Sequence, residues 1–173
     1  MAPQRIWAFT NLGYDYEGFH VTDFYRALYR ATVDLGFTVS EWLQARGFYE
    51  GNTEAVIGRW IATRESEAKY SLNCLTINSK IIWQNVPKPG TPAETENPPL
   101  VPKGTFNFTV NGFILLDFLN VWGTSPVLRP FTGIRDNILR RRMKGNLIAS
   151  NRKEGDLLIK NIREFASFLP NIK

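Results

Sequence analysis

The stretch TFNFTVNGFILLDFLNVW, residues 105–122, does most to determine the fold that this sequence predicts. Its first half alternates apolar and polar residues, which is the period of a strand with one buried face. The apolar residues are Phe106, Phe108 and Val110, and the polar ones are Asn107, Thr109 and Asn111. From Phe113 onward both faces are apolar, as expected where a strand is covered on both sides. We therefore expect one long strand in the interior of a sheet.

A short strand and a helix are expected at the start of the chain. The segment IWAFT, residues 6–10, predicts a strand that ends in a turn at residues 11–13. Residues 23–35 predict an amphipathic helix, with Thr22 as the N-cap and Gly36 just past its end. Three strands are then expected at 38–49, 54–64 and 70–83. Strands that follow one another directly indicate an antiparallel meander.

Two helices are expected after the long strand. Ser125 and Pro126 are typical of a helix start, and Gly145-Asn146 is typical of a helix end. A second helix should then run from 147 to 169, with Gly155 weakening its first half. The predicted fold class is therefore α+β. It comprises an antiparallel sheet of about five strands, one helix after the first strand and two C-terminal helices.

The composition fits a single domain over residues 1–173. Hydrophobic residues make up 43% of the chain and aromatic residues 13%, which indicates a true core. No apolar run is long enough to span a bilayer, and the N-terminus lacks the apolar core of a signal peptide. We expect a soluble, unprocessed protein, and a location inside a cell or within a virion would fit equally.

The segment 86–104 interrupts the pattern, because it holds six of the ten prolines. Proline resists both helices and sheet ladders and favours an extended backbone. One interpretation is a long hairpin tip that joins two strands. The other is an arm that becomes ordered against a partner.

Positive charge is concentrated near the C-terminus. Residues 129–153 carry eight basic residues against one acid, a net charge of +7, whereas the rest of the chain carries 13 basic and 15 acidic residues, a net charge of −2. A helix turns by about 100° per residue, so consecutive arginines cannot all face a core. We expect a partner- or phosphate-binding patch in the basic C-terminal region 126–169, although a solvated helix end would look similar. Its candidate residues are Arg135, Arg140, Arg141, Arg142, Lys144, Arg152 and Lys153.

Residues suited to catalysis are sparse. The single histidine, His20, and the single cysteine, Cys74, cannot form a metal cluster, and Cys74 has no basic neighbour that would stabilise a thiolate. No phosphate-binding glycine loop or nucleophile elbow occurs. Asp117 interrupts an apolar run, and we expect it to form a structural ion pair with Arg129 or Arg135. We therefore expect no catalytic residue, no metal site and no cofactor.

Carboxylates spaced two apart give a weaker signal. Asp15 with Glu17, Glu65 with Glu67, and Glu154 with Asp156 have this spacing. On a strand it places both carboxylates on one face, as acid–base catalysis would need, but it is also common in solvated turns.

Several segments together resemble a group of uncharacterised small archaeal α+β proteins. They are DFYRALYRATVDLGF at 23–37, GRWIAT at 58–63, FTVNGFILLDF at 108–118 and a W-x3-P motif at Trp122 and Pro126. The last motif precedes the two expected basic helices. The resemblance covers most of the chain and implies the same fold, but it brings no activity, cofactor or catalytic residue.

The functional expectation is a non-enzymatic structural or adaptor subunit of a larger assembly, such as a virion or tail component or a ribonucleoprotein. Its partners would be other protein subunits, copies of itself included. The alternative is a nucleic-acid-binding protein that uses the basic patch at 129–153.

Overall fold

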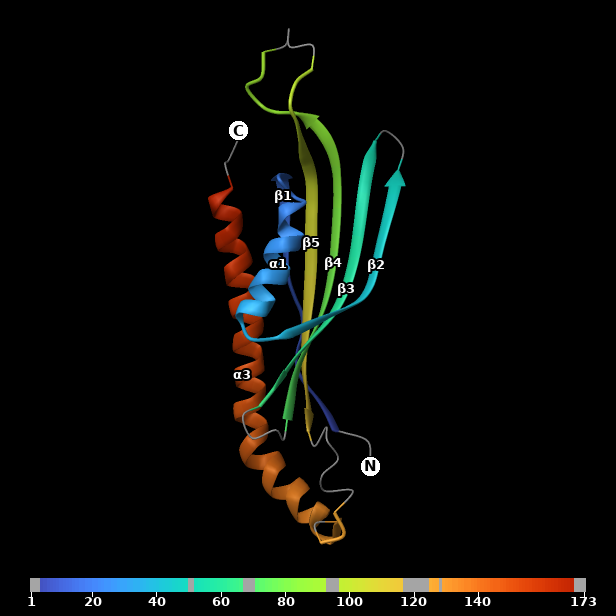
Figure 1. Ribbon diagram of the computed structural model, residues 1–173. Helices are drawn as coiled ribbons and strands as arrows, with labels where there is room; N and C mark the ends of the chain where they lie inside the picture. Colours follow the sequence, from blue (N-terminus) through green and yellow to red (C-terminus); the bar gives the residue numbers. More distant parts are fainter. Residues whose placement is uncertain are drawn as a thin grey trace.

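In its described part, the protein is an antiparallel sheet covered on one face by the helices α1 and α3 (Figure 1). The computed structural model describes residues 4–49, 52–66, 71–92, 97–116, 125–127 and 129–169. Within these ranges, the side chains of residues 4, 42, 49, 129 and 132–144 are not described. The mixed helix-and-strand class and the antiparallel sheet are confirmed.

Within the described ranges, the sheet has five strands in the order β1-β5-β4-β3-β2. They are β1 (Gln4–Phe19), β2 (Thr38–Tyr49), β3 (Thr53–Glu65), β4 (Ser71–Pro87) and β5 (Leu100–Leu116). Strands β2 to β5 form the expected meander, and β5 then pairs with β1. Because β5 returns to β1, β2 and β1 are left as the two edges.

Strand β5 has the two-part character expected of it. Phe106, Phe108 and Val110 are buried on the helix-facing side, and Phe113 and Ile114, on opposite faces, are both buried. On the outer face, the Arg5 guanidinium lies 4.1 Å from the centre of the Phe113 ring. The expected continuation through residues 117–122 lies outside the described residues.

Strand β1 is longer than predicted, and the predicted turn at residues 11–13 is wrong. The register of β1 against β5 shifts twice, between Trp7 and Phe9 and between Phe9 and Leu12. Asn11 has a positive φ of 56°, and its backbone N–H donates to the Asn111 side chain at 2.8 Å. The register shifts around Phe9 and Asn11 are therefore irregularities within a continuous strand, because pairing with β5 resumes at Leu12.

Helix α1 (Asp23–Asp34) has nearly the expected bounds. Gly36 has a φ of 81°, its N–H donates to the carbonyl of Val33, and the N–H of Phe37 donates to the carbonyl of Thr32. These two bonds form a Schellman motif, which a glycine at this position favours. Thr22 occupies the expected N-cap position, but its side chain makes no capping hydrogen bond.

Helix α3 (Thr132–Phe168) replaces the two C-terminal helices that the sequence predicted. A short 3-10 turn, η1 (Arg129–Phe131), precedes it, so the helix begins later than Ser125. The predicted stop at Gly145-Asn146 is wrong. A glycine within a helix costs about 1 kcal/mol relative to alanine, which long flanking helical segments can offset.

Two glycines set the distance between α3 and the sheet. A Cβ at Gly155 on α3 would lie 2.5 Å from Cζ of Phe9, and a Cβ at Gly112 on β5 would lie 2.2 Å from Cε1 of the same ring. The Phe9 ring therefore lies between two backbones that approach closely because they lack side chains. Gly155 serves helix–sheet packing rather than weakening the helix.

The proline-rich segment 86–104 is mostly part of the β4–β5 hairpin. The two strands remain paired as far as Pro87 and Leu100, and the N–H of Lys88 donates to the carbonyl of Pro99 at 2.8 Å. Pro102 lies within β5, where its carbonyl accepts from the N–H of His20. Proline has no backbone N–H to donate, but its carbonyl can still accept a hydrogen bond. The missing donor is tolerated here because β1 ends at this point. The expected hairpin tip is therefore shorter than residues 86–104, and the partner-binding arm stays a prediction.

Candidate interaction surfaces

The predicted basic patch lies on α3. The backbone of α3 carries Arg135, Arg140, Arg141, Arg142 and Lys144, but their side chains lie outside the described residues. Arg152 and Lys153 are exposed. The lower part of α3 continues past the ends of the strands (Figure 1). Part of the basic segment 129–153 therefore extends beyond the sheet. The ion pair expected between Asp117 and Arg129 or Arg135 lies outside the described residues.

The inner face of α3 holds a buried polar cluster. Glu154 is buried and pairs with the half-buried Arg64 of β3, and the Arg64 guanidinium also donates to the carbonyl of Leu35 at 2.7 Å. Burial raises the pKa of Glu154, and the Arg64 charge acts against that rise. Asn151 is fully buried on the same face of the helix, and neither end of its amide has a partner in the described part of the chain. The cluster ties α3 to the sheet.

Of the carboxylate pairs suggested by spacing, one shares a face in the structure and one does not. Glu154 faces the sheet whereas Asp156 is exposed, because residues two apart on a helix lie on different faces. Asp15 and Glu17 do share a face of β1, where Asp15 accepts a hydrogen bond from Asn107 at 2.7 Å. The third pair includes Glu67, which lies outside the described residues.

The lone cysteine and histidine are far apart. Cys74 is 1% exposed, and burial raises its pKa to about 11, with the Arg5 charge acting against the rise. It pairs with Phe113 in the sheet, whereas His20 follows the pairing of Phe19 with Lys103, roughly 30 Å along the strand. Cys74 is therefore a core residue. No cluster of three metal-ligating side chains is found in the part of the chain that the structure describes.

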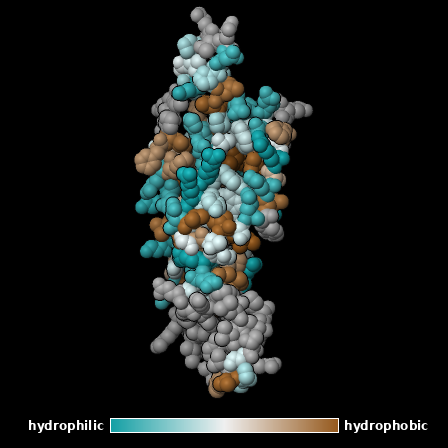
Figure 2. All heavy atoms as spheres, in the orientation of Figure 1, coloured by the Kyte–Doolittle hydropathy of each residue, from teal (hydrophilic) through white to brown (hydrophobic). Residues whose placement is uncertain are grey.

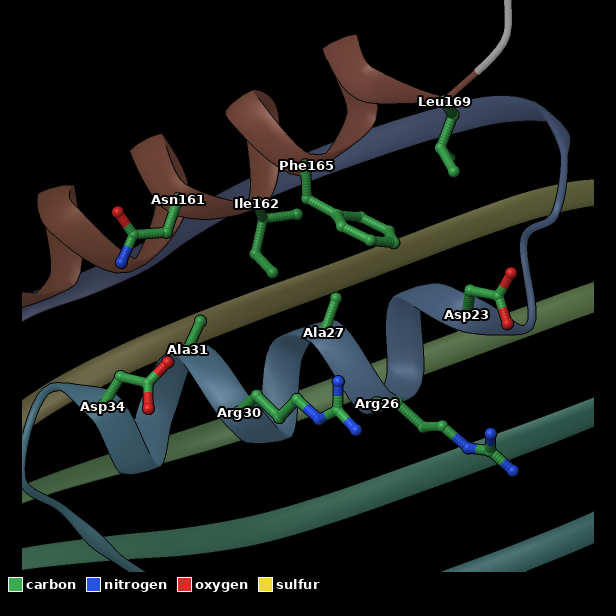
Figure 3. Close-up of a pocket in the computed structure, with 10 residues that line it drawn as sticks. All are labelled: Asp23, Arg26, Ala27, Arg30, Ala31, Asp34, Asn161, Ile162, Phe165 and Leu169. Atoms are coloured by element: carbon green, nitrogen blue, oxygen red, sulfur yellow. The ribbon is translucent and has the colours of Figure 1, made fainter.

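A groove runs between α1 and α3 (Figure 3). Its volume is about 540 Å³, within the range of small-molecule pockets. Ile162 and Phe165 of α3 point toward Ala27 and Ala31 of α1, so the floor is apolar. The remaining lining residues are Asp23, Arg26, Arg30, Asp34, Asn161 and Leu169. Two arginines and two aspartates balance in charge, and the lining includes no histidine, cysteine or serine.

Strand β2 is exposed on both faces and at its outer edge. Leu43 is 45% exposed on the outer face of the sheet, and Phe48 is 73% exposed on the helix-facing side. Figure 1 shows the β2–β3 hairpin leaning away from both helices. The sequence predicts this strand but not its edge position, because strand order depends on the return of β5 to β1.

Two charged residues on β2 are held in place by neighbours. Tyr25 of α1 donates its hydroxyl hydrogen to Glu41, and Trp60 donates its indole N–H to Tyr25 at 3.1 Å. Burial, and then the bond to Glu41, raise the pKa of Tyr25 to about 12, so the phenol remains a donor at neutral pH. Arg46 pairs with Glu54 and lies over the Phe48 ring at 5.4 Å. Both charges are therefore fixed on the helix-facing side of the edge.

Comparison with known proteins identifies no family. No protein-family model matches this chain, and no curated protein matches it. Among solved structures, the chain is similar to an uncharacterized protein from Rhizobium leguminosarum with 13% sequence identity and a TM-score of 0.19. The alignment covers 92% of this chain and 99% of that chain.

No helix within the described ranges is both long and apolar enough to cross a bilayer. The face in Figure 2 is largely hydrophilic over the described residues, with several small apolar patches rather than a single large one. Surfaces of this kind bind partners through hydrogen bonds and charge as well as through apolar contact.

Proposed function

We propose that this protein is a non-enzymatic structural or adaptor subunit of a larger assembly, such as a virion or tail component or a ribonucleoprotein. The observation that carries the proposal is the open edge at β2, a strand of 12 residues with exposed apolar side chains on both faces. An edge strand offers a row of backbone donors and acceptors to a further strand.

The two edges of the sheet differ in a way that supports a role for β2. Proteins commonly protect free edges with bulges, prolines, lysines or a covering helix. Strand β1 has two register shifts and contacts α3. Strand β2 has one register shift, and although α1 contacts it, residues 41 and 43–48 are exposed. Its edge is therefore the one suited to pairing.

Two further elements would provide secondary contacts. Residues 88–92 and 97–99 of the β4–β5 hairpin extend beyond the other strands, and α3 projects at the opposite end of the sheet (Figure 1). A subunit with contact sites at both ends and along one side can join several neighbours at once.

The mass of the native particle tests this proposal. The protein should be isolated under mild conditions from the cells that make it and measured by size-exclusion chromatography with light scattering. We expect a complex well above the mass of two chains, with partner subunits identified by mass spectrometry. Recovery of a monomer or an isolated dimer without other partners would contradict the proposal.

Nucleic-acid binding is the second candidate function. It is favoured by a segment with a net charge of +7 on a helix that passes beyond the sheet, with Arg152 and Lys153 exposed. Each phosphate contact contributes about 0.9 to the slope of log affinity against log salt. Replacing Arg140, Arg141 and Arg142 with alanine should flatten that slope by about 2 to 3.

A matched control separates the segment from general charge. Alanine at Arg26, Arg30 and Arg59 removes three exposed cations outside the segment and should leave the slope nearly unchanged. Absence of binding to DNA and RNA at low salt, or equal losses in the two triple variants, would contradict a role for the segment.

A further inference from the structure

We infer that β2 pairs with β2 of a second copy of this chain, which joins two sheets into one across a two-fold axis. This inference deepens the proposed function by naming the partner at the open edge, and it rests on that edge being used for assembly. It is carried by the register of β2 and the charges that the register places on one face.

The observed register sets the face of each β2 residue. Glu41 lies opposite Trp60 and Leu43 lies opposite Arg59, so Trp42 is one extra residue on β2. Without that residue, Glu41 and Arg46 would lie on opposite faces. With it, both lie on the helix-facing side.

A fully overlapping, antiparallel pairing of two β2 strands is self-complementary. If Trp42 is counted as the bulged residue in both copies, Gln44 lies on the two-fold axis. Glu41 of each copy then lies opposite Arg46 of the other, which creates two opposite-charge pairs. The same register places Val39 opposite Phe48 and Leu43 opposite Ala45. Each pair has both members on one face of the joined sheet, as a ladder requires.

The charges are already positioned for this contact. The bond from Tyr25 holds Glu41 at the edge without neutralising its charge. The Arg46 side chain is 61% exposed and has five N–H donors, so it can bind a second carboxylate while it keeps Glu54. Little side-chain conformational freedom would therefore be lost on pairing.

A two-fold axis perpendicular to the sheet also preserves the layers. The helix-facing sides of both copies lie on the same side of the joined sheet. Helices α1 and α3 therefore remain on one side of the joined sheet, and no covered surface has to be exposed.

Charge reversal gives a direct test by sedimentation equilibrium. We expect the wild-type chain to form a dimer. Glu41→Arg places Arg against Arg46 twice, and Arg46→Glu places Glu against Glu41 twice. Each change should weaken self-association roughly 10- to 100-fold, because two attractive pairs become repulsive.

The mixture of the two variants provides the sharpest readout. A heterodimer of Glu41→Arg with Arg46→Glu has one arginine and one glutamate in each pair, so mixing should restore dimers that neither variant forms alone. Circular dichroism should show that each variant is folded. Lys80→Glu, an exposed charge reversal on the interior strand β4, should dimerise like the wild type.

The outcomes separate this inference from the proposed function. Three results would overturn β2 pairing: a monomeric wild type, charge-reversal variants that dimerise as well as the wild type, or a mixture that forms no more dimer than either variant alone. If the native protein nevertheless occurs in a large complex, the assembly role stands without it. A dimer that forms through β2 but has no other native partner would support the inference and contradict the assembly role.

Discussion

The Phe9 ring shows how one side chain can determine the spacing of two layers. It lies between Gly112 of β5 and Gly155 of α3, and it is buried. The register shifts on either side of Phe9 are part of the same arrangement, because they place its side chain against the helix. The irregular section of β1 is thus explained by packing.

Gly155→Ala tests this packing. The added methyl group would meet the Phe9 ring at 2.5 Å, and overpacking costs about 1–3 kcal/mol. Better helix propensity recovers about 1 kcal/mol. We expect a net loss of up to about 2 kcal/mol in the free energy of unfolding, measured by denaturant titration.

Gly145→Ala is the matched control, since a Cβ there meets nothing within 4 Å. It should stabilise the protein by about 0.5–1 kcal/mol. Combining Gly155→Ala with Phe9→Leu should give a loss smaller than the sum of the single changes. Equal stabilisation at both glycines would show that the ring does not limit the approach of α3.

Glu154 should make stability depend on pH. Burial raises its pKa in the folded protein above the unfolded value of 4.5, so the folded state binds the proton more tightly. Its contribution is fully present below pH 4.5 and is lost as the pH rises through the folded pKa. The difference in unfolding free energy between the wild type and Glu154→Gln should therefore fall over that interval.

Denaturant titrations at a series of pH values measure this difference. Asp156→Asn is the control, because Asp156 lies on the exposed side of the same helix turn. A constant difference between the wild type and Glu154→Gln across the series would show that the buried carboxyl has an ordinary pKa.

At the scale of elements, the sequence predicted best where local signals agree. The bounds of α1 differ by one residue from the expected 23–35, because Gly36 adopts the positive φ that ends a helix. Strand β2 has its expected bounds. The charge of the basic segment at 129–153 follows from the sequence alone, and its binding role stays a prediction.

The remaining features depend on tertiary contacts. Asn11 has the positive φ of a turn residue, and only pairing with β5 reveals that the strand continues. Gly145 resembles a helix end, but α3 continues through it. The exposure of β2 follows from the strand order, and the shared face of Glu41 and Arg46 follows from the bulge at Trp42. The periodicity of the sequence determines neither feature.

The hairpin tip offers a prediction at this scale. Residues 89–98 lie between Lys88 and Pro99, which are already joined by a backbone hydrogen bond. Replacing the ten residues with Asn-Gly, a turn suited to hairpins, shortens the loop and should raise the unfolding free energy by about 1 kcal/mol. Thermal melting measures the effect, and loss of folding would contradict it.

The same variant separates the two interpretations of the proline-rich segment. A simple hairpin tip can be removed without changing the native complex. If the segment is an arm that binds a partner, the shortened protein should remain folded but no longer copurify with that partner.

At the scale of the molecule, the two proposed surfaces are linked by symmetry. Pairing through β2 would place both α3 helices on the same side of the joined sheet, with their basic N-terminal halves at opposite ends. A helix of 37 residues is roughly 55 Å long, so the two basic segments would be widely separated. A short polyanion could then contact one segment, whereas a long one could contact both.

This arrangement predicts length-dependent binding by the dimer. Glu41→Ala combined with Arg46→Ala removes both charge pairs but keeps the net charge at +5. Compared with the wild type, this variant should bind a duplex of about 10 base pairs equally well, because one segment suffices. On a duplex of about 60 base pairs it should bind at least about 10-fold more weakly, because linked sites raise the effective concentration of the second. Fluorescence anisotropy at fixed low salt measures both affinities. Equal affinities on the long duplex, with dimer loss verified by sedimentation, would show that the two basic segments do not act together.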